Sequence, residues 1–290
     1  MINLKNIKKV FLLLFIISIV TAVPRFAVKN GTTCNQCHVN PTGGAMRNYY
    51  GTTVYSTQYL PMERLKQFSN EFYMGLLGDH LRIGGDFRVQ EMKYNYKSEE
   101  NLESKNALLV MQGDIYANLD INEKASIYYK TGINTEYSKP EFWTMVNFLE
   151  DNILYFKIGR GLPNFGFRID DHTAFIRGGN HKIKYGFNKE GMVFNPMSNI
   201  PGIFEIGFYQ GYNTFITGSI ANSYINGSAV YGKEKFKNKN LALKINYNIS
   251  LFNKWNLTIT PSIMSEGNIK LKSAAFGASN QMFTWLYEID

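Results

Sequence analysis

The residues with the clearest chemical capacity lie near the N-terminus, at positions 34–38. Cys34 and Cys37 are the only two cysteines of the chain, and His38 follows directly. Two thiols at this spacing followed by histidine form the C-x-x-C-H pattern, which is typical of covalent c-type haem attachment. The spacing lets both thiols reach two vinyl groups on one porphyrin edge, and the next residue brings an imidazole to the iron. The sequence therefore predicts one covalent haem c on Cys34 and Cys37, with His38 as axial iron ligand.

Three other interpretations of the cysteine pair are less consistent with its surroundings. A structural zinc site needs about four ligands, and no second Cys or His pair completes one. A thioredoxin-like redox pair begins a helix after a strand, whereas Gly31, Pro41, Gly43 and Gly44 give this segment the composition of a loop. A plain disulfide remains the simplest structural alternative.

A haem that only transfers electrons usually has a second axial ligand from the protein. Met46 lies eight residues after His38, behind the flexible segment 41–44, and its thioether could wrap to the opposite haem face. His80 is the alternative sixth ligand. The sequence also leaves open an iron with no sixth protein ligand.

The first 22 residues predict export from the cytoplasm. Lys5, Lys8 and Lys9 precede an uninterrupted apolar run at 10–20, and Ala22 supplies a small residue for cleavage. This order is typical of a secretory signal peptide, and the run is shorter than the roughly 20 residues of a spanning helix. Removal of residues 1–22 would lower the net charge from +8 to +5. That mild charge gives no reason to expect a nucleic-acid partner.

Residues 23–78 are expected to form a small haem-binding domain of helix and loop. Pro61 can begin a helix, and apolar residues with helical spacing follow it, at positions 62, 65, 68, 72 and 76. A segment of this size buries little surface. Residues 79–290 are therefore expected to help shield the haem from solvent.

Residues 79–290 show the period-2 alternation of β-strands. In the segment 107–121, apolar residues such as Ile115 and Leu119 alternate with polar ones such as Asp114 and Asn118. The segments 81–90, 125–130, 240–251 and 255–263 repeat the pattern, with a turn at 252–254. Such alternation gives each strand one apolar and one polar face.

A soluble β-sandwich and a transmembrane β-barrel can both produce this alternation. Runs of about 9–12 residues match the length of a tilted strand that crosses a bilayer, and aromatic residues make up 15% of the chain, as interfacial girdles require. The fold class predicted is therefore mainly β, an antiparallel transmembrane β-barrel of roughly ten to twelve strands after residue 79. The last alternating segment, 281–290, stops mid-pattern, so it either pairs with the first strand or leaves the barrel incomplete at the C-terminus.

Three segments together resemble the monohaem porin–cytochrome fusion proteins of bacterial outer membranes, which are related in type to outer-membrane iron-oxidising cytochromes. They are PRFAVKNGTTCNQCHVNPTGGAMRNYYG, LGDHLRIGGDFR and FKIGRGLPNFGFRIDDHTAFIR, and the resemblance covers most of residues 23–180. It implies that a small haem domain plugs or caps a barrel and passes electrons across the outer membrane. It also implies attachment through Cys34 and Cys37, ligation by His38 and, less directly, by Met46.

The function expected is electron transfer across or at the outer membrane, by iron that cycles between Fe(II) and Fe(III). The expected partners are outer-membrane lipid and periplasmic or extracellular redox proteins. The haem domain is expected in the periplasm or the barrel lumen, and in the lumen it would face the inward side chains of Arg82, Asp86, Arg88 and Asp114.

Two other functions stay open at the level of sequence. One is a solute-conducting porin with a tethered periplasmic cytochrome that moves no electrons across the membrane. The other is an enzyme with five-coordinate haem, which would reveal itself by high-spin iron.

Overall fold

The computed structural model describes residues 25–55, 75–97, 102–132, 140–149, 153–167, 184–185, 188–189, 200–211, 213–223, 238–252, 254–280 and 282–289. The predicted leader and most of the helix predicted after Pro61 lie outside these residues. Leu76, the last of the positions with helical spacing, is described and lies in a short strand, β1 (Leu76–Leu77), so the helical prediction is wrong there. Among the described residues, no helix is both long enough and apolar enough to span a bilayer.

The described fold is dominated by one antiparallel sheet of twelve strands, in which each strand is hydrogen-bonded to its neighbours along the sheet. In sheet order the strands are β1 (Leu76–Leu77), β2 (Leu81–Lys97), β3 (Leu102–Asp120), β4 (Ala125–Gly132), β5 (Glu141–Phe148), β6 (Leu154–Arg160), β9 (Gly202–Gln210), β10 (Thr214–Asn222), β11 (Lys239–Leu251), β12 (Trp255–Glu266), β13 (Ile269–Ser279) and β14 (Thr284–Ile289). Two short strands, β7 (Lys184–Tyr185) and β8 (Asn188–Lys189), pair separately. The main sheet is a simple meander in which β6 pairs directly with β9.

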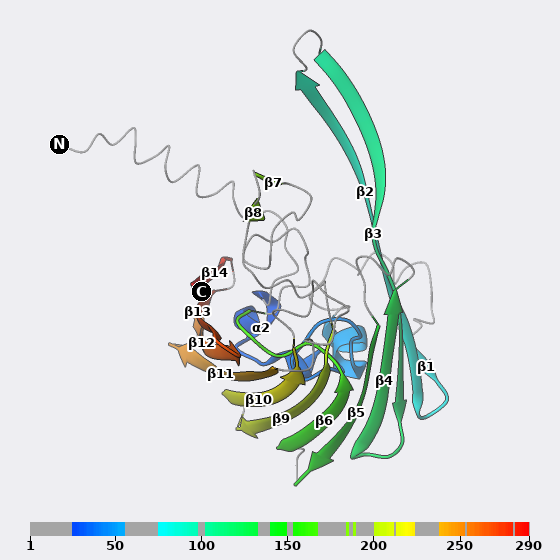
Figure 1. The fold of residues 1–290 in the computed structure, drawn as a ribbon. Coiled ribbons are helices and arrows are strands. Elements are labelled where there is room, and N and C mark those ends of the chain that lie inside the picture. The colour runs from blue at the N-terminus through cyan, green and yellow to red at the C-terminus, as the bar shows by residue number, and fades with distance from the viewer. Residues whose placement is uncertain are drawn as a thin grey trace, which may run out of the picture.

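The sheet curls around the N-terminal segment, as Figure 1 shows. This segment contains α2 (Arg25–Asn30), the 3₁₀ turn η1 (Cys34–Gln36) and the π-helical turn η2 (Tyr50–Tyr55). The sheet is not closed, because β1 and β14 form its two opposite edges. The described structure is therefore an open, curved sheet with the N-terminal segment on its concave side.

The two ends of the strands carry different connections. Short turns join neighbouring strands at one end, at residues 121–124, 211–213, 252–254 and 280–283. The longest connections, residues 161–201 and 223–238, leave from the opposite end. The β2–β3 hairpin also extends beyond the sheet at that end (Figure 1).

The concave face of the sheet is polar and the convex face is apolar. On β4, Tyr128 and Lys130 are buried toward the concave side, while Tyr129 between them is 45% exposed. Polar residues buried on the concave side include Asp114, Asn118, Ser126, Glu141, Lys157, Glu205, Thr217, Asn240, Lys244, Asn248, Thr260, Glu266 and Ser273. Large apolar residues exposed on the convex side include Ile115, Leu119, Phe142, Ile158, Phe204, Phe208, Ile220, Leu241, Leu243, Ile245, Ile263, Phe276, Trp285 and Tyr287.

The structure confirms the mainly β prediction and the alternation on which it depended. Of the twelve strands in the main sheet, only β1 begins before residue 79, which agrees with the expected ten to twelve strands. The turn predicted at 252–254 joins β11 to β12. The last predicted strand pairs with β13 and not with the first strand, so the described strands form an antiparallel sheet that is not closed.

Candidate functional site

The C-x-x-C-H residues share a single tight turn. The backbone N–H groups of Cys37 and His38 both donate to the carbonyl oxygen of Cys34, over 3.2 and 3.0 Å. Both cysteines are partly buried, and no disulfide joins them. The turn therefore presents two thiols and one imidazole within five consecutive residues, which is the donor set expected for covalent haem attachment.

Asn48 holds this turn through three hydrogen bonds that sequence reasoning missed. Its side-chain Nδ2 donates to the carbonyl oxygens of Asn35 and Gln36, over 2.9 and 3.0 Å. Its backbone N–H donates to the carbonyl oxygen of Cys37 over 3.0 Å. The asparagine thus satisfies backbone acceptors between and at the two cysteines, and it fixes the turn without contributing a ligand.

Gly51 supports the same turn by its lack of a side chain. It lies in η2, and its N–H donates to the Oδ1 of Asn48 over 2.9 Å. A Cβ at this position would lie 2.2 Å from the carbonyl oxygen of Cys37, a contact that would force the backbone apart. The sequence signal was the glycine in the stretch NYYG, but its partner Cys37 is visible only in the fold.

The segment after the turn folds back on itself. His38 pairs with Arg47 in an antiparallel bridge, and the N–H of Val39 donates to the carbonyl oxygen of Met46 over 3.1 Å. Because successive residues of an extended chain point to opposite sides, this pairing directs the side chains of His38 and Met46 away from each other.

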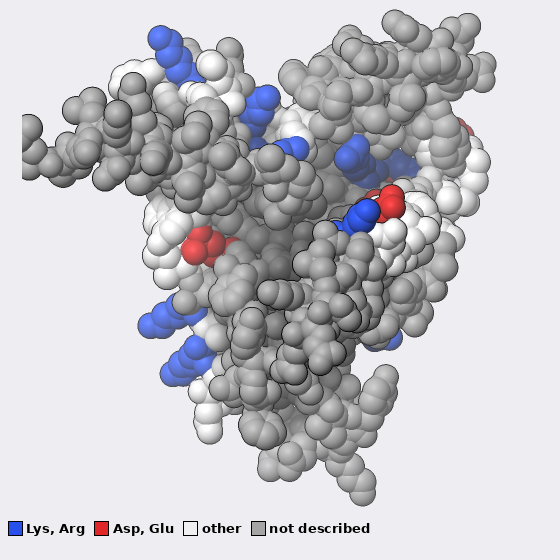
Figure 2. Space-filling view, turned by 90° about the horizontal axis from the view of Figure 1, so that it is seen from above, with Lys and Arg blue, Asp and Glu red and all other residues white. Residues whose placement is uncertain are grey.

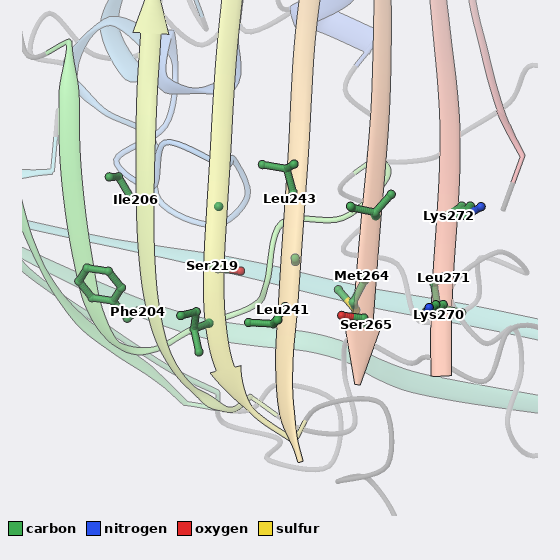
Figure 3. Close-up of a pocket in the computed structure, with 14 residues that line it drawn as sticks. Phe204, Ile206, Ser219, Leu241, Leu243, Met264, Ser265, Lys270, Leu271 and Lys272 are labelled. Atoms are coloured by element: carbon green, nitrogen blue, oxygen red, sulfur yellow. The ribbon is translucent and has the colours of Figure 1, made fainter. Parts of the chain in front are cut away.

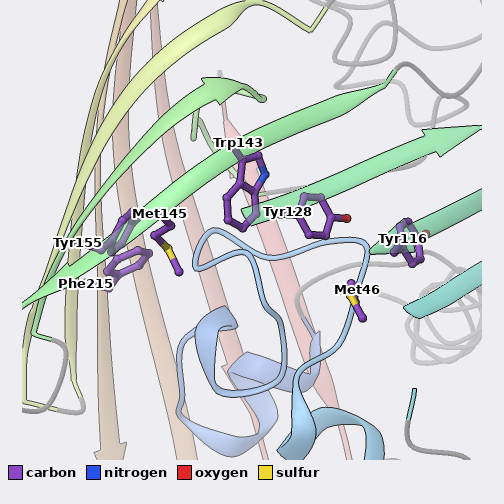
Figure 4. Close-up of a cluster of buried hydrophobic side chains, with 7 residues drawn as sticks. All are labelled: Met46, Tyr116, Tyr128, Trp143, Met145, Tyr155 and Phe215. Carbon is purple, nitrogen blue, oxygen red and sulfur yellow. The ribbon is translucent and has the colours of Figure 1, made fainter. Parts of the chain in front are cut away.

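Met46 packs against the concave face of the sheet. It is buried in a cluster with Tyr116, Tyr128, Trp143, Met145, Tyr155 and Phe215 (Figure 4). His80 lies elsewhere, exposed in the turn between β1 and β2, where its carbonyl oxygen accepts from the N–H of Asp120 over 2.9 Å. Ligation of iron by Met46 or by His80 stays a prediction, and ligation by Met46 would require this loop to rearrange.

A buried ion pair joins the N-terminal segment to the sheet. The Nζ of Lys157 on β6 lies 2.6 Å from the Oε1 of Glu205 on β9 and donates to the Oδ1 of Asn40 over 3.1 Å. The hydroxyl of Tyr155 donates to the same Glu205 oxygen over 2.9 Å. Buried charges are tolerated when they are paired and hydrogen-bonded. Asn40, two residues after His38, is thereby tied to the concave face.

A second attachment lies at α2. The Nδ2 of Asn256 on β12 donates to the carbonyl oxygen of Lys29 over 2.6 Å. The side chain of Val28 is almost fully buried, and it occupies the space that a Cβ on Gly277 of β13 would need. The N-terminal segment therefore contacts both the middle strand β6 and the C-terminal strands β12 and β13 of the concave face.

The charged residues predicted to point inward do so only in part. Arg82 lies 3.1 Å from Asp120, and its cross-strand partner Asn118 is buried on the concave side. Asp114 is buried and lies 3.9 Å from Lys130. Asp86 pairs across the strands with Asp114 but is exposed, while the Arg88 side chain lies outside the described set.

The environment of Cys37 favours a thiol over a thiolate. Burial raises the pKa of Cys37, and the nearby Arg47 lowers it in part. Redox-active cysteine pairs instead rely on a lowered pKa. The raised pKa is a further argument against a thioredoxin-like pair.

The cavity beside Cys34 is too small for a porphyrin. It measures about 30 Å³ and is lined in part by Thr33, Phe215, Lys244 and Thr258, which leaves room for about one water molecule. The donor set thus fits haem c, whereas the ring would have to lie outside this cavity.

Comparisons of this chain with protein-family models, with curated proteins and with solved structures found no match. The resemblance to porin–cytochrome fusions stays a prediction. The function is therefore inferred from the residues and geometry of the N-terminal segment and the sheet.

Proposed function

We propose that this chain is a monohaem c-type cytochrome joined to a porin-like sheet of the bacterial outer membrane, and that it carries electrons at or across that membrane. One observation carries the proposal. A C-x-x-C-H turn whose two cysteines form no disulfide is fixed on the polar, concave side of a sheet whose convex side is apolar.

The inverted polarity of the sheet supports the membrane location. Outer-membrane strands alternate apolar residues toward lipid with polar residues toward the lumen. A soluble sheet would expose its polar face to water and bury its apolar one. Exposed apolar side chains continue from β3 to β14, far more than the scattered apolar residues of an ordinary surface.

Each residue of the turn has a distinct role in this proposal. Cys34 and Cys37 would attach the haem covalently, and His38 would ligate its iron. Asn48 and Gly51 keep the turn in shape, and the bond from Lys157 to Asn40 holds the segment against the sheet. Bound haem would supply one-electron redox chemistry.

The alternative function, a solute-conducting porin with a tethered cytochrome, draws support from the polar lining of the concave face. The N-terminal segment lies along that same lining and bonds to it through Lys157 and Asn256. This arrangement favours a sheet that houses the haem segment over one that conducts solutes.

The test is expression of the full chain with its leader in a bacterium that has a c-type maturation system. We expect a membrane-bound protein that retains haem after denaturing electrophoresis, and a Cys34→Ser/Cys37→Ser variant that does not. Proteoliposomes with an enclosed electron acceptor would then be compared with conductance recordings. Colourless wild-type protein would refute the cytochrome, and conductance without electron transfer would favour the porin alternative.

A further inference from the structure

A groove of about 620 Å³ crosses the convex face of the sheet. It runs over β9, β10, β11, β12 and β13, so it lies on the side opposite to the haem segment. Figure 3 shows Leu241 and Leu243 in its middle, with Phe204 and Ile206 on one side and Lys270 and Lys272 on the other.

Two rows of cross-strand neighbours form the groove, and each row ends in a lysine. In the first row, Phe204, Ile220, Leu241 and Ser265 lead across the strands to Lys270. In the second row, Ile206, Gly218, Leu243 and Ile263 lead to Lys272. The groove is therefore an apolar channel across the strands with a basic end.

Gly218 provides the depth of the groove. It stands between Ile206 and Leu243, where both neighbouring strands carry a large apolar residue. A Cβ at Gly218 would lie 3.7 Å from the Cγ2 of Ile206, which is an ordinary van der Waals contact. The backbone would accept a side chain here, and that side chain would fill the groove.

Lys270 and Lys272 are exposed and available to a ligand. The four ion pairs found among the described residues include neither of them. Both lie close to the β12–β13 turn, at the end of the sheet that carries the long connections. Among the described residues seen from that end, Lys and Arg side chains are more prominent than Asp and Glu (Figure 2).

We propose that this groove binds one lipid of net negative charge, with an acyl chain over Gly218 and an anionic phosphate headgroup between Lys270 and Lys272. The inference rests on the membrane location in the proposed function. In outer-membrane barrels the longer loops face outward, so the bound lipid belongs to the outer leaflet. Lysines at the edge of an apolar surface also match the preference of their ammonium groups for lipid headgroups.

Two features favour a lipid over a protein as occupant. The groove is continuous with the apolar convex face of the neighbouring strands, so its surroundings would be covered by acyl chains in a membrane. Among the described residues that line the groove, the only charged ones are the two lysines at one end. This polarity matches a single anionic group attached to a long apolar chain.

The experiment measures lipid binding to the detergent-purified full chain by native mass spectrometry. The probes are phosphatidic acid and phosphatidylcholine with identical acyl chains. We expect Lys270→Gln/Lys272→Gln to weaken phosphatidic acid binding by roughly thirtyfold, at about 1 kcal/mol per lysine, and to weaken binding of the zwitterionic phosphatidylcholine much less. Gly218→Leu should weaken both lipids. Lys254→Gln, in a short turn at the other end of β12, is the matched control and should change neither.

Equal binding of both lipids, or a Lys270→Gln/Lys272→Gln variant that binds phosphatidic acid as well as the wild type, would overturn the lipid site. Far-ultraviolet circular dichroism of each variant separates lost binding from lost folding. Failure of the membrane proposal looks different, because the wild-type protein would then stay soluble without detergent. Failure of the cytochrome proposal leaves lipid binding intact, so the Cys34→Ser/Cys37→Ser variant should bind phosphatidic acid normally.

Discussion

Two neighbouring residue pairs on β6 and β9 face opposite sides of the sheet and have opposite chemistry. Lys157 pairs across the strands with Glu205, and the next pair is Ile158 with Phe204. The charged pair is fully buried on the concave side, whereas Ile158 is 62% exposed on the convex side. One residue along the chain thus separates a buried ion pair from an exposed apolar pair.

This contrast indicates that the two faces are stable in different surroundings, one polar and hydrogen-bonded and the other apolar. A buried ion pair is stable only with good geometry and further hydrogen bonds, and here Tyr155 and Asn40 supply them. An exposed row of isoleucine, leucine and phenylalanine is unfavourable in water and favourable in lipid. The concave face is therefore organised around the N-terminal segment, and the convex face is suited to acyl chains.

The largest expected effect comes from breaking the charged pair. Glu205→Leu leaves the Lys157 ammonium buried without its carboxylate, and we expect a loss of about 3–5 kcal/mol in unfolding free energy. Urea titration in detergent micelles, followed by tryptophan fluorescence, would measure it. The double variant Lys157→Met/Glu205→Leu is the control and should recover most of the loss. A single variant as stable as the wild type would show that the pair is not buried.

A charge on the convex face should have a somewhat smaller effect. Ile245 lies at the middle of β11 on the apolar side, and an arginine at the bilayer midplane costs about 2–4 kcal/mol. The free energy of folding into vesicles should therefore be less favourable by that amount for Ile245→Arg than for the wild type. Ile245→Val should behave like the wild type. If the convex face were in contact with water, Ile245→Arg would fold as favourably as the wild type. That result would contradict the assignment of the convex face to lipid.

A single methyl group added at Gly51 should destabilise the turn that holds the two cysteines. In Gly51→Ala the new Cβ would clash with the carbonyl oxygen of Cys37, and overpacking of this kind costs about 1–3 kcal/mol. We expect a reduced yield of covalent haem, measured as the ratio of haem absorbance to protein. Tyr49→Ala, at an exposed position in the same segment, should leave the yield unchanged. Full haem yield in Gly51→Ala would mean that the turn changes shape during attachment.

The sequence predicts the strands and the cysteine motif because both depend on short spacing. Alternation with period 2 is visible within one strand, and C-x-x-C-H occupies five residues. The packing of the N-terminal segment depends instead on contacts such as Lys157 with Asn40, which are 117 residues apart. The roles of Asn48 and Gly51 were missed for a similar reason, since each acts through backbone atoms of a turn whose shape appears only on folding. The open edges of the sheet also depend on pairing between distant strands.

The smallest expected effect concerns this long-range contact. Asn40→Ala removes one acceptor from the Lys157 ammonium but leaves Glu205 in place, so we expect a loss of about 1–2 kcal/mol in unfolding free energy. Asn40→Asp keeps an acceptor oxygen and should preserve most of the stability. Limited proteolysis of the N-terminal segment is the second measurement, because a released segment would be cleaved faster in Asn40→Ala. If the N-terminal segment were cleaved no faster in Asn40→Ala than in Asn40→Asp, the contacts of α2 with Asn256 and Gly277 would be sufficient to keep the segment on the sheet.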